Sequence, residues 1–177
     1  YLPVGVNLVG VTGTRGKSTT TQLIYEILKR SPLEGANVFL GGNVRNVSTL
    51  ALLDQVKSRD IVVMELDSWA LHGMGDIKTS PHIAVFTTFM SDHMNFYKGD
   101  MDAYLSDKAN IFKYQSPDDV LVLGSQCAEL VREAYLNIQS KVIVPNTDKF
   151  PYKLKIPGEH NVYNAACAVE AVRALGV

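Results

Sequence analysis

The stretch of sequence that decides the fold is Gly10-Val11-Thr12-Gly13-Thr14-Arg15-Gly16-Lys17-Ser18. It joins an apolar segment that predicts a strand (residues 4–11) to a segment whose apolar residues recur at helical spacing (residues 18–30). This is the context of a phosphate-binding loop, because glycines let the backbone approach phosphate oxygens and the N–H groups at a helix start point at negative charge. Lys17 adds a positive charge for the phosphates, and the Ser18 hydroxyl can bind magnesium.

The spacing of the glycines departs from the usual form of such a loop. That form has a glycine five residues before Gly16, where this chain has Val11, and here the glycines fall at a spacing of three. A glycine-rich turn followed by a chance Gly-Lys-Ser is the alternative, and the strand before and the helix after argue against it.

Outward from the loop, strands alternate with helices along the whole chain. This predicts an α/β fold of the P-loop NTPase type, with a mostly parallel sheet covered by helices on both faces. The remaining strands are expected at residues 37–40, 61–66, 83–88, 120–123 and 142–144, and the remaining helices at residues 48–56, 101–114, 128–137 and 161–175.

The bulk composition narrows the possible functions. Hydrophobic residues make up 46% of the 177 residues, enough for the core of one domain. The net charge of −1 gives no basic surface for nucleic acid, and no apolar run is long enough to cross a membrane. Cys127 and Cys167 lack metal-ligand spacing, which favours buried thiols in a cytoplasmic protein. The chain begins at Tyr1, almost on a strand, so we expect a domain excised from a longer protein.

Several motifs in a fixed order give the chain its resemblance to the Mur ligase family. The phosphate loop has that family's Gly-x-x-Gly-x-x-Gly-Lys-Ser/Thr spacing. Four further segments are similar to family motifs in the same order, namely Gly41-Gly42-Asn43, Glu65-Leu66-Asp67-Ser68-Trp69, Asp92-His93-Met94 with Asp107-Lys108-Ala109, and Gly158-Glu159-His160-Asn161 with Asn164. The second of these is most similar to the members that add D-glutamate, although Asp67 stands where those have serine and Ala70 where they have glutamine.

The resemblance implies an ATP-dependent amide ligase that works through an acyl phosphate. The substrates that it implies are UDP-N-acetylmuramoyl-L-alanine and D-glutamate, for peptidoglycan precursor synthesis. The chain as a whole, residues 1–177, corresponds to the family's central ATP-binding domain. Domains for the nucleotide sugar and for the amino acid would lie outside it, so we expect this chain alone to form no amide bond.

The resemblance also assigns ATP-binding residues. These are Gly13, Thr14, Arg15, Gly16, Lys17, Ser18, Thr19, His160, Asn161 and Asn164. Asn161 and Asn164 lie three residues apart on one predicted helix, and amides offer the donor and acceptor that suit the edge of adenine. Helix capping by Asn161 is the plainer alternative, compatible with the first.

Metal and substrate contacts complete the implied site. Glu65 ends a buried strand, where a carboxylate is costly unless it is paired or bound to a metal, and Ser18, Glu65 and ATP phosphates suit magnesium. The alternative for Glu65 is a carboxylate at a helix start without metal. His93 is implied as a further metal or substrate ligand, against a structural role, whereas His72 and His82 have no such support. Substrate contacts are implied for Asn43, which could instead be a left-handed turn residue, and for Ser68.

Lys108 is the most informative single residue. Steps of three and four along its predicted helix place it on the apolar stripe with Tyr104, Ile111 and Phe112. Burial favours the neutral amine, which reacts with carbon dioxide to give a carbamate. In the family, the matching lysine is carbamylated and helps to hold a second magnesium ion. A lysine that reaches out to solvent is the alternative.

Three other functions compete with this interpretation. A ligase of the same architecture could act on another cell-wall peptide, on polyglutamate or on folate. A nucleotide-binding module could lack catalysis, although the presence of Lys17, Glu65, His93 and Lys108 argues against a degenerate site. A switch-type GTPase would need an Asn-Lys-x-Asp motif, which the sequence does not contain.

Overall fold

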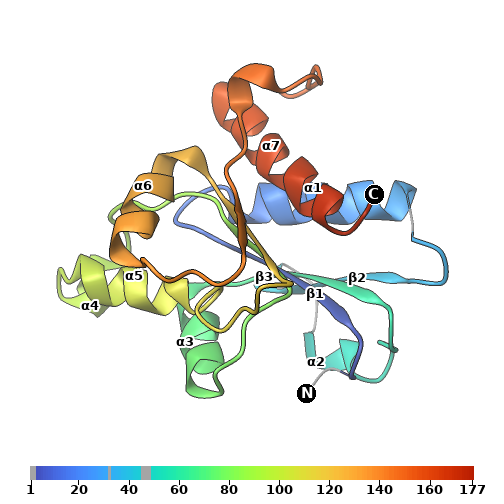
Figure 1. The fold of residues 1–177 in the computed structure, drawn as a ribbon, viewed down its shortest axis with the longest axis horizontal. Helices are drawn as coiled ribbons and strands as arrows, with labels where there is room; N and C mark the ends of the chain where they lie inside the picture. The colour runs from blue at the N-terminus through green and yellow to red at the C-terminus, as the bar shows by residue number, and fades with distance from the viewer. Residues whose placement is uncertain (1–2, 32, 45–48) are drawn as a thin grey trace.

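The computed structural model describes residues 3–31, 33–44 and 49–177. Strands and helices alternate as the sequence predicts (Figure 1). The strands are β1 (Asn7–Thr12), β2 (Val38–Gly42), β3 (Ile61–Glu65), β4 (Ile83–Phe86), β5 (Val120–Leu123) and β6 (Lys141–Ile143). The helices are α1 (Lys17–Arg30), α2 (Thr49–Leu52), α3 (Ser68–Asp76), α4 (Met94–Tyr97), α5 (Met101–Ala109), α6 (Ser125–Ala134) and α7 (Glu159–Ala174), with a short 3₁₀ turn η1 (Thr147–Lys149).

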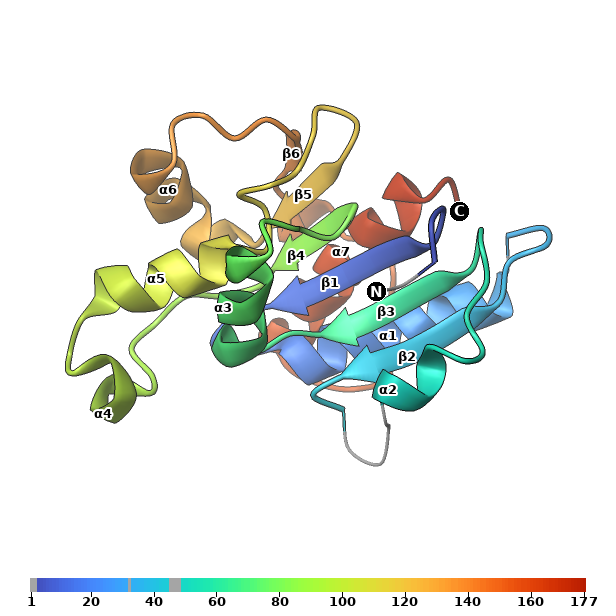
Figure 2. The same cartoon turned by 90° about the horizontal axis from the view of Figure 1, so that it is seen from below.

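The six strands form one parallel sheet in the order β2-β3-β1-β4-β5-β6. The order reverses direction at β1, which lies between β3 and β4. In open parallel sheets, ligands bind at such a switch point, outside the carboxyl ends of the strands. The register brings Val11 beside Glu65 and Thr12 beside Phe86 at that edge. Figure 2 shows β1 between β3 and β4. The phosphate loop therefore leaves the sheet at its switch point.

Each face of the sheet has its own apolar core. On one face, valines and isoleucines of the central strands pack against α1 and α7 through Ile24, Leu28 and Ala168. On the other face, Phe86 and Leu123 pack against α3, α5 and α6. Figure 1 shows α1 and α7 on one side of the sheet, with α2 and α3 on the other. The predicted two-sided covering of a parallel sheet is confirmed.

The predicted helix over residues 101–114 is too long. α5 ends at Ala109, and the following N–H groups of Ile111 and Phe112 bond to the carbonyls three residues back, at 3.2 and 3.0 Å. This tighter winding carries both side chains into the core, where each is buried. The apolar residues therefore do face the core as their spacing indicates, but those after Ala109 lie in turns and not in the helix.

Two helices near the carboxyl ends of the strands were not predicted from the sequence pattern. α3 contains Gly73 and Gly75, which weaken its helical signal, and it begins with Asp67 accepting a 2.8 Å bond from the Ala70 N–H. α4 is four residues long, too short for periodicity to show. Of the predicted helix at residues 48–56, α2 covers the beginning, and the expected cap at Ser48 lies outside the described residues.

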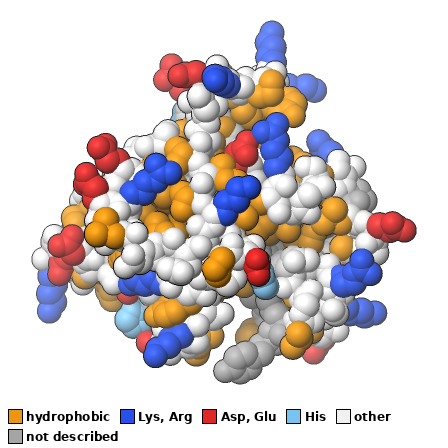
Figure 3. All heavy atoms as spheres, viewed as in Figure 1, with side chains coloured by type: hydrophobic (Ala, Val, Ile, Leu, Met, Phe, Trp, Pro, Cys, Tyr) orange, Lys and Arg blue, Asp and Glu red, His pale blue; other side chains and the backbone are white. Residues whose placement is uncertain are grey.

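The surface is mixed in character. Lysine, arginine and acidic side chains are interspersed on the face drawn in Figure 3, in keeping with a net charge of −1. Within the described ranges, no helix has both the length and the apolar character needed to cross a membrane.

Candidate nucleotide-binding site

The glycines of the phosphate loop are required by close contacts with neighbouring elements. Gly13 and Gly16 have positive φ values of 145° and 85°. A Cβ atom on Gly13 would collide with Thr87, and one on Gly16 would collide with the amide of Asn164. Gly10 lies in β1 against Pro81. The glycine spacing of three thus arises from one close contact in strand β1 and two turns of the phosphate loop. Val11, which stands where the usual form of the loop has glycine, does not disrupt it.

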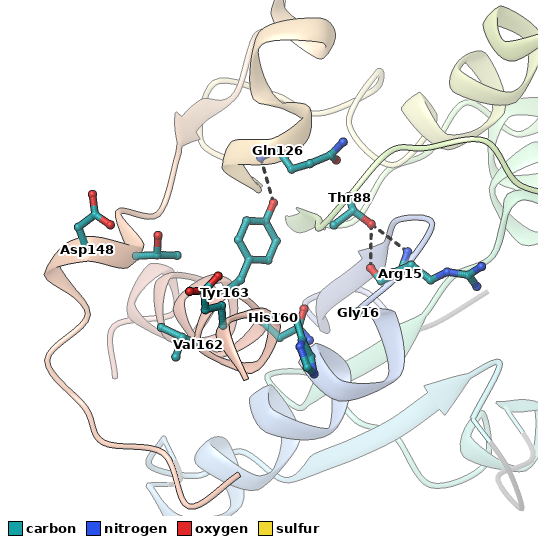
Figure 4. Close-up of a pocket in the computed structure, with 11 residues that line it drawn as sticks. Arg15, Gly16, Thr88, Gln126, Asp148, His160, Val162 and Tyr163 are labelled. Atoms are coloured by element: carbon teal, nitrogen blue, oxygen red, sulfur yellow. Dashed lines mark hydrogen bonds between the residues drawn. The ribbon is translucent and has the colours of Figure 1, made fainter. Parts of the chain in front are cut away.

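The residues after β4 hold the loop in place. Thr14 N–H donates to the Thr88 carbonyl at 2.7 Å, and Arg15 N–H donates to the Thr88 hydroxyl at 2.9 Å, the latter drawn in Figure 4. The Thr87 hydroxyl donates to the Arg15 carbonyl at 2.6 Å. Thr87 and Thr88 were not predicted as site residues, although two hydroxyl residues at the carboxyl end of a predicted parallel strand are a usable signal.

Lys17 begins α1 and folds over its own loop. Its Nζ donates to the carbonyl of Gly13 at 2.9 Å and to that of Thr14 at 3.2 Å. Burial lowers its pKa, against the attraction of Glu65 and Asp92. Ser18 is exposed and Thr19 half-buried on the first turn, at the positive end of the helix dipole. These are the positions that the phosphate-loop prediction requires.

Glu65 lies where the sequence placed it, at the end of β3, and is only 5% exposed. Within the described residues its carboxylate makes no hydrogen bond or ion pair, and its charge acts on Lys17. The Glu65 carbonyl accepts from the Asn43 N–H at 2.9 Å. A side chain on Gly42 (φ 82°) would overlap the Glu65 backbone. The Gly41-Gly42-Asn43 segment thus presses against the strand end, and Asn43 itself is exposed.

Lys108 reaches the phosphate loop from α5. Its side chain is 1% exposed, and its Nζ donates to the Gly13 carbonyl at 3.1 Å and to the Thr12 hydroxyl at 3.4 Å. The Nζ also lies 4.9 Å from the centre of the Tyr104 ring. Burial, helped by the charge of Lys17, lowers the pKa of Lys108 to about 7. The alternative of a lysine reaching solvent is wrong, and carbamylation stays a prediction.

His93 precedes α4 in a left-handed conformation, with φ 55°. Its ring centre lies 5.2 Å from that of Trp69 and 6.3 Å from that of Tyr104, the tyrosine that Lys108 also contacts. Asp92 accepts from the His93 N–H at 2.9 Å and pairs with Arg15 of the loop at 3.5 Å. The structure therefore joins the His93 segment to the phosphate loop.

The predicted metal ligands come from four different elements. Among the described residues, no group of three or more His, Cys, Asp or Glu side chains could hold a metal by itself. Ser18, Glu65, His93 and Lys108 therefore remain a prediction that depends on oxygens from phosphate, water and a carbamate. Ser68, predicted to touch substrate, is buried, and its side chain hydrogen-bonds to Tyr97.

A pocket of about 800 Å³ opens between the loop and the start of α7 (Figure 4). Arg15, Gly16, His160 and Asn164 line it as the sequence predicts. Asn161 does not line it: its amide donates to the Pro157 carbonyl at 2.6 Å. The predicted capping role of Asn161 is wrong, since Gly158 is the N-cap and Asn161 lies in the first turn. Its contact with ATP stays a prediction.

The same pocket has walls that the sequence analysis missed. Tyr163 donates to the Thr87 carbonyl at 2.6 Å. Its oxygen also accepts from the Gln126 N–H at 3.3 Å, a bond drawn in Figure 4. The Gln126 side chain is fixed in turn by both backbone groups of Phe89. The predicted helix at residues 128–137 began too late, because α6 starts at Ser125 and brings Gln126 to the pocket.

The fold and this loop define a P-loop α/β domain, and comparison with known proteins defines its family. Residues 11–144 match the Mur ligase middle domain, and the chain belongs to this family. It is 34% identical over 189 residues to a protein of Acetivibrio thermocellus called UDP-N-acetylmuramoylalanine–D-glutamate ligase, covering 93% of this chain and 39% of that one. A protein of the same name from Elusimicrobium minutum is 31% identical, over 100% of this chain and 43% of that one.

Solved structures agree on the fold. MurF ligase from Thermotoga maritima, crystallised in complex with ADP, superimposes with a TM-score of 0.72 at 19% identity, over 97% of this chain and 46% of that one. MurC from Thermotoga maritima gives 0.63 at 25% identity, covering 97% and 42%. The chain thus spans about two fifths of the curated relatives that it matches.

Proposed function

We propose that this chain is the ATP-binding part of an ATP-dependent amide ligase that adds D-glutamate to UDP-N-acetylmuramoyl-L-alanine. Membership of the Mur ligase middle-domain family supports the general reaction. The names of the relatives from Acetivibrio thermocellus and Elusimicrobium minutum support the particular substrates. The reaction belongs to peptidoglycan precursor synthesis, which we place in the cytoplasm.

The observation that carries the proposal is the convergence of two lysines on one carbonyl. Lys17 from the loop and Lys108 from α5 both donate to the carbonyl oxygen of Gly13. A simple nucleotide-binding loop needs the first lysine alone. A second, fully buried lysine, brought to the loop from 95 residues away, supports a role in chemistry on the transferred phosphate.

The residues at the loop fit a nucleotide. The positive φ values of Gly13 and Gly16 leave a cradle that any Cβ atom would fill. Lys17, together with the backbone of residues 13–19, would hold the phosphates. His160 and Asn164 would contact the base, since both line the pocket beside the loop.

The magnesium ligands in this proposal are Ser18 and Glu65 for one ion, and His93 with carbamylated Lys108 for a second. Magnesium and Lys17 would together spread the negative charge that develops at the γ-phosphate. Asn43, exposed at the same edge of the sheet, would orient the substrate carboxylate. The buried Ser68 would act on the substrate only through its neighbours.

In the proposed reaction, the substrate carboxylate attacks the γ-phosphorus of ATP and ADP leaves, which gives an acyl phosphate. The amine of D-glutamate then attacks the acyl carbon, loses a proton and displaces inorganic phosphate. Holding both substrates side by side accounts for much of the rate in such reactions. Since the residues for the nucleotide sugar and the amino acid are expected in other domains, this chain alone should bind ATP and form no amide bond.

The test uses the full-length enzyme with ATP, magnesium, UDP-N-acetylmuramoyl-L-alanine and D-glutamate. We expect ADP and a product heavier by one glutamate residue, in equal amounts by mass spectrometry. L-Glutamate, glycine and D-alanine serve as matched alternatives to D-glutamate. ADP release without any amide product would contradict the ligase assignment, and a preference for another amino acid would move the chain to a different member of the family.

A further inference from the structure

Asp107 stands at a junction of three helices beside the proposed site. One of its carboxylate oxygens accepts from the Tyr97 hydroxyl of α4 at 2.9 Å. The other lies 3.0 Å from Nδ1 of His72 on α3. Asp107 itself is on α5, one residue before Lys108. A single carboxylate therefore ties α3, α4 and α5 together.

The place of this carboxylate on its own helix is unfavourable. Asp107 is in the last turn of α5, where the helix dipole disfavours negative charge. Its two partners, from α3 and α4, offset that cost. Asp107 therefore stabilises the contacts of α5 with α3 and α4, since it does not stabilise α5 by itself.

The position of α4 depends on such contacts. It is four residues long, and left-handed residues flank it, His93 with φ 55° and Lys98 with φ 52°. Residues other than glycine rarely adopt that conformation, and four residues are too few for a stable isolated helix, so α4 is not self-supporting. Tyr97 is its buried anchor: its ring packs on Tyr104, and its hydroxyl meets Asp107.

The two neighbours on α5 face different partners. Asp107 turns to α3 and α4, while Lys108 turns inward to the Gly13 carbonyl of the phosphate loop. Successive residues on a helix project about 100° apart, so one segment of α5 can meet both. The Tyr97–Asp107 bond thus fixes the helix that follows His93 relative to the helix that carries Lys108.

We propose that Asp107 is a positioning residue, whose carboxylate sets His93 of the α4 segment and Ser68 of α3 in register with Lys108 and the phosphate loop. The inference rests on the proposed function for its effect on catalysis. Its geometric content, the placement of α4 by Asp107, can be tested without any activity. Asp107 acts through its neighbours and need not touch substrate.

Trp69 provides a reporter of that geometry. It is the only tryptophan in this chain, and its ring lies edge-on to His93 and to Phe96, at 5.2 and 5.5 Å. Incorporation of fluorotryptophan in the full-length enzyme, with Trp69→Phe to assign the signal, gives a ¹⁹F resonance sensitive to α4. Asp107→Ala and Tyr97→Phe should both shift it. Asp102→Asn, which changes an exposed acid on the same helix, should leave it in place.

Steady-state kinetics of the same variants give the second readout. Asp107→Ala should lower kcat about tenfold, with the KM for ATP within about twofold, because misplacement of reacting groups costs rate. The double variant with Tyr97→Phe should fall no further than the worse single variant, since both remove the same Tyr97–Asp107 hydrogen bond. Asp107→Asn keeps an oxygen that accepts from Tyr97, so it should restore most of kcat.

Each result has a defined meaning. A wild-type enzyme that forms no amide product refutes the proposed function and leaves the resonance of Trp69 to decide this inference. With an active wild type, either an unshifted resonance or an unchanged kcat in folded Asp107→Ala overturns it. If Asp107 had a purely structural role, Asp107→Ala would lower the melting temperature and leave the Trp69 resonance and kcat at their wild-type values.

Discussion

The phosphate loop and the α3–α5 region lie next to each other, yet they are specified in opposite ways. The loop is encoded locally, by a strand, three glycines and a lysine within nine residues, and Thr87 and Thr88 then hold it in place. The α3–α5 region is assembled by contacts between distant residues, such as His72 with Asp107. The comparison teaches that phosphate binding can be inherited in a short motif, while the chemistry around it depends on tertiary placement.

Lys108 is where the two regions meet, and its removal should have the largest effect. In the full-length enzyme, Lys108→Ala should lose about 99% or more of ligase activity, since the group would contribute to charge stabilisation in the transition state. Acetate should restore part of it, by supplying carboxylate oxygens in place of the carbamate. Rates with and without acetate check this.

The matched control for that experiment is Lys113→Ala, which changes an exposed lysine five residues on whose Nζ hydrogen-bonds to Ser106. It should retain nearly full activity. A fully active Lys108→Ala enzyme would contradict the proposed role. So would an inactive one that acetate never rescues, if the parent carries no extra mass on Lys108.

Lys17 tests the local half of the comparison. Lys17→Ala should weaken binding of magnesium-ATP by more than about tenfold, since a hydrogen bond to a charged phosphate is worth about 1.5–3 kcal/mol. Calorimetry on the full-length enzyme measures this. Lys29→Ala, at the other end of α1, should bind as the parent does. Equal affinity in the Lys17 variant would remove the case for a phosphate loop.

Gly16 separates backbone strain from steric contact. Gly16→Ala puts a Cβ atom at a φ of 85° and against the Asn164 amide, whereas Gly35→Ala has a φ of 74° and open space around it. Both should lose about 1–2 kcal/mol of unfolding free energy from the left-handed conformation. Only Gly16→Ala should lose additional unfolding free energy through its contact with Asn164, and it should also weaken ATP binding several-fold.

The Asn164→Ala background sharpens this comparison, since it removes the atoms that the new Cβ atom meets. The extra loss in Gly16→Ala should shrink there towards the value for Gly35→Ala, as denaturant melts would report. If the two glycine variants are equally stable in the parent, the packing of Asn164 on the loop is not as close as the structure has it.

The same difference between locally specified and tertiary structure decides which features could be predicted from the sequence. All six strands and the loop were predicted, because buried parallel strands are apolar runs and the glycine motif is local. The burial of Lys108 followed from its place on an apolar stripe. α3 and α4 were missed, since glycines obscure the one and the other has no periodicity. The Asn161 contact with Pro157 could not be predicted, because the turn at Gly158 decides it.

The smallest effect that we predict belongs to His72, which the sequence analysis treated as ordinary. The hydrogen bond to Asp107 raises the pKa of His72 above its usual 6.5. A raised folded-state pKa means that the stabilisation is complete below pH 6.5, where the unfolded state is protonated too, and fades as the pH rises through the folded value. The free-energy difference between the parent and His72→Gln should therefore be larger at pH 6 than at pH 9.

Urea melts of the full-length enzyme at the two pH values measure this difference. The effect should be small, because the His72 side chain is exposed and solvent screens the pair. In an Asp107→Asn background the pKa of His72 should fall back towards its usual value, with the charge of Asp76 still raising it, and the pH dependence of the His72→Gln difference should shrink with it. A difference that grows from pH 6 to pH 9 would show that neutral imidazole stabilises the junction. The Asp107 carboxylate would then hold α3 through a neutral hydrogen bond.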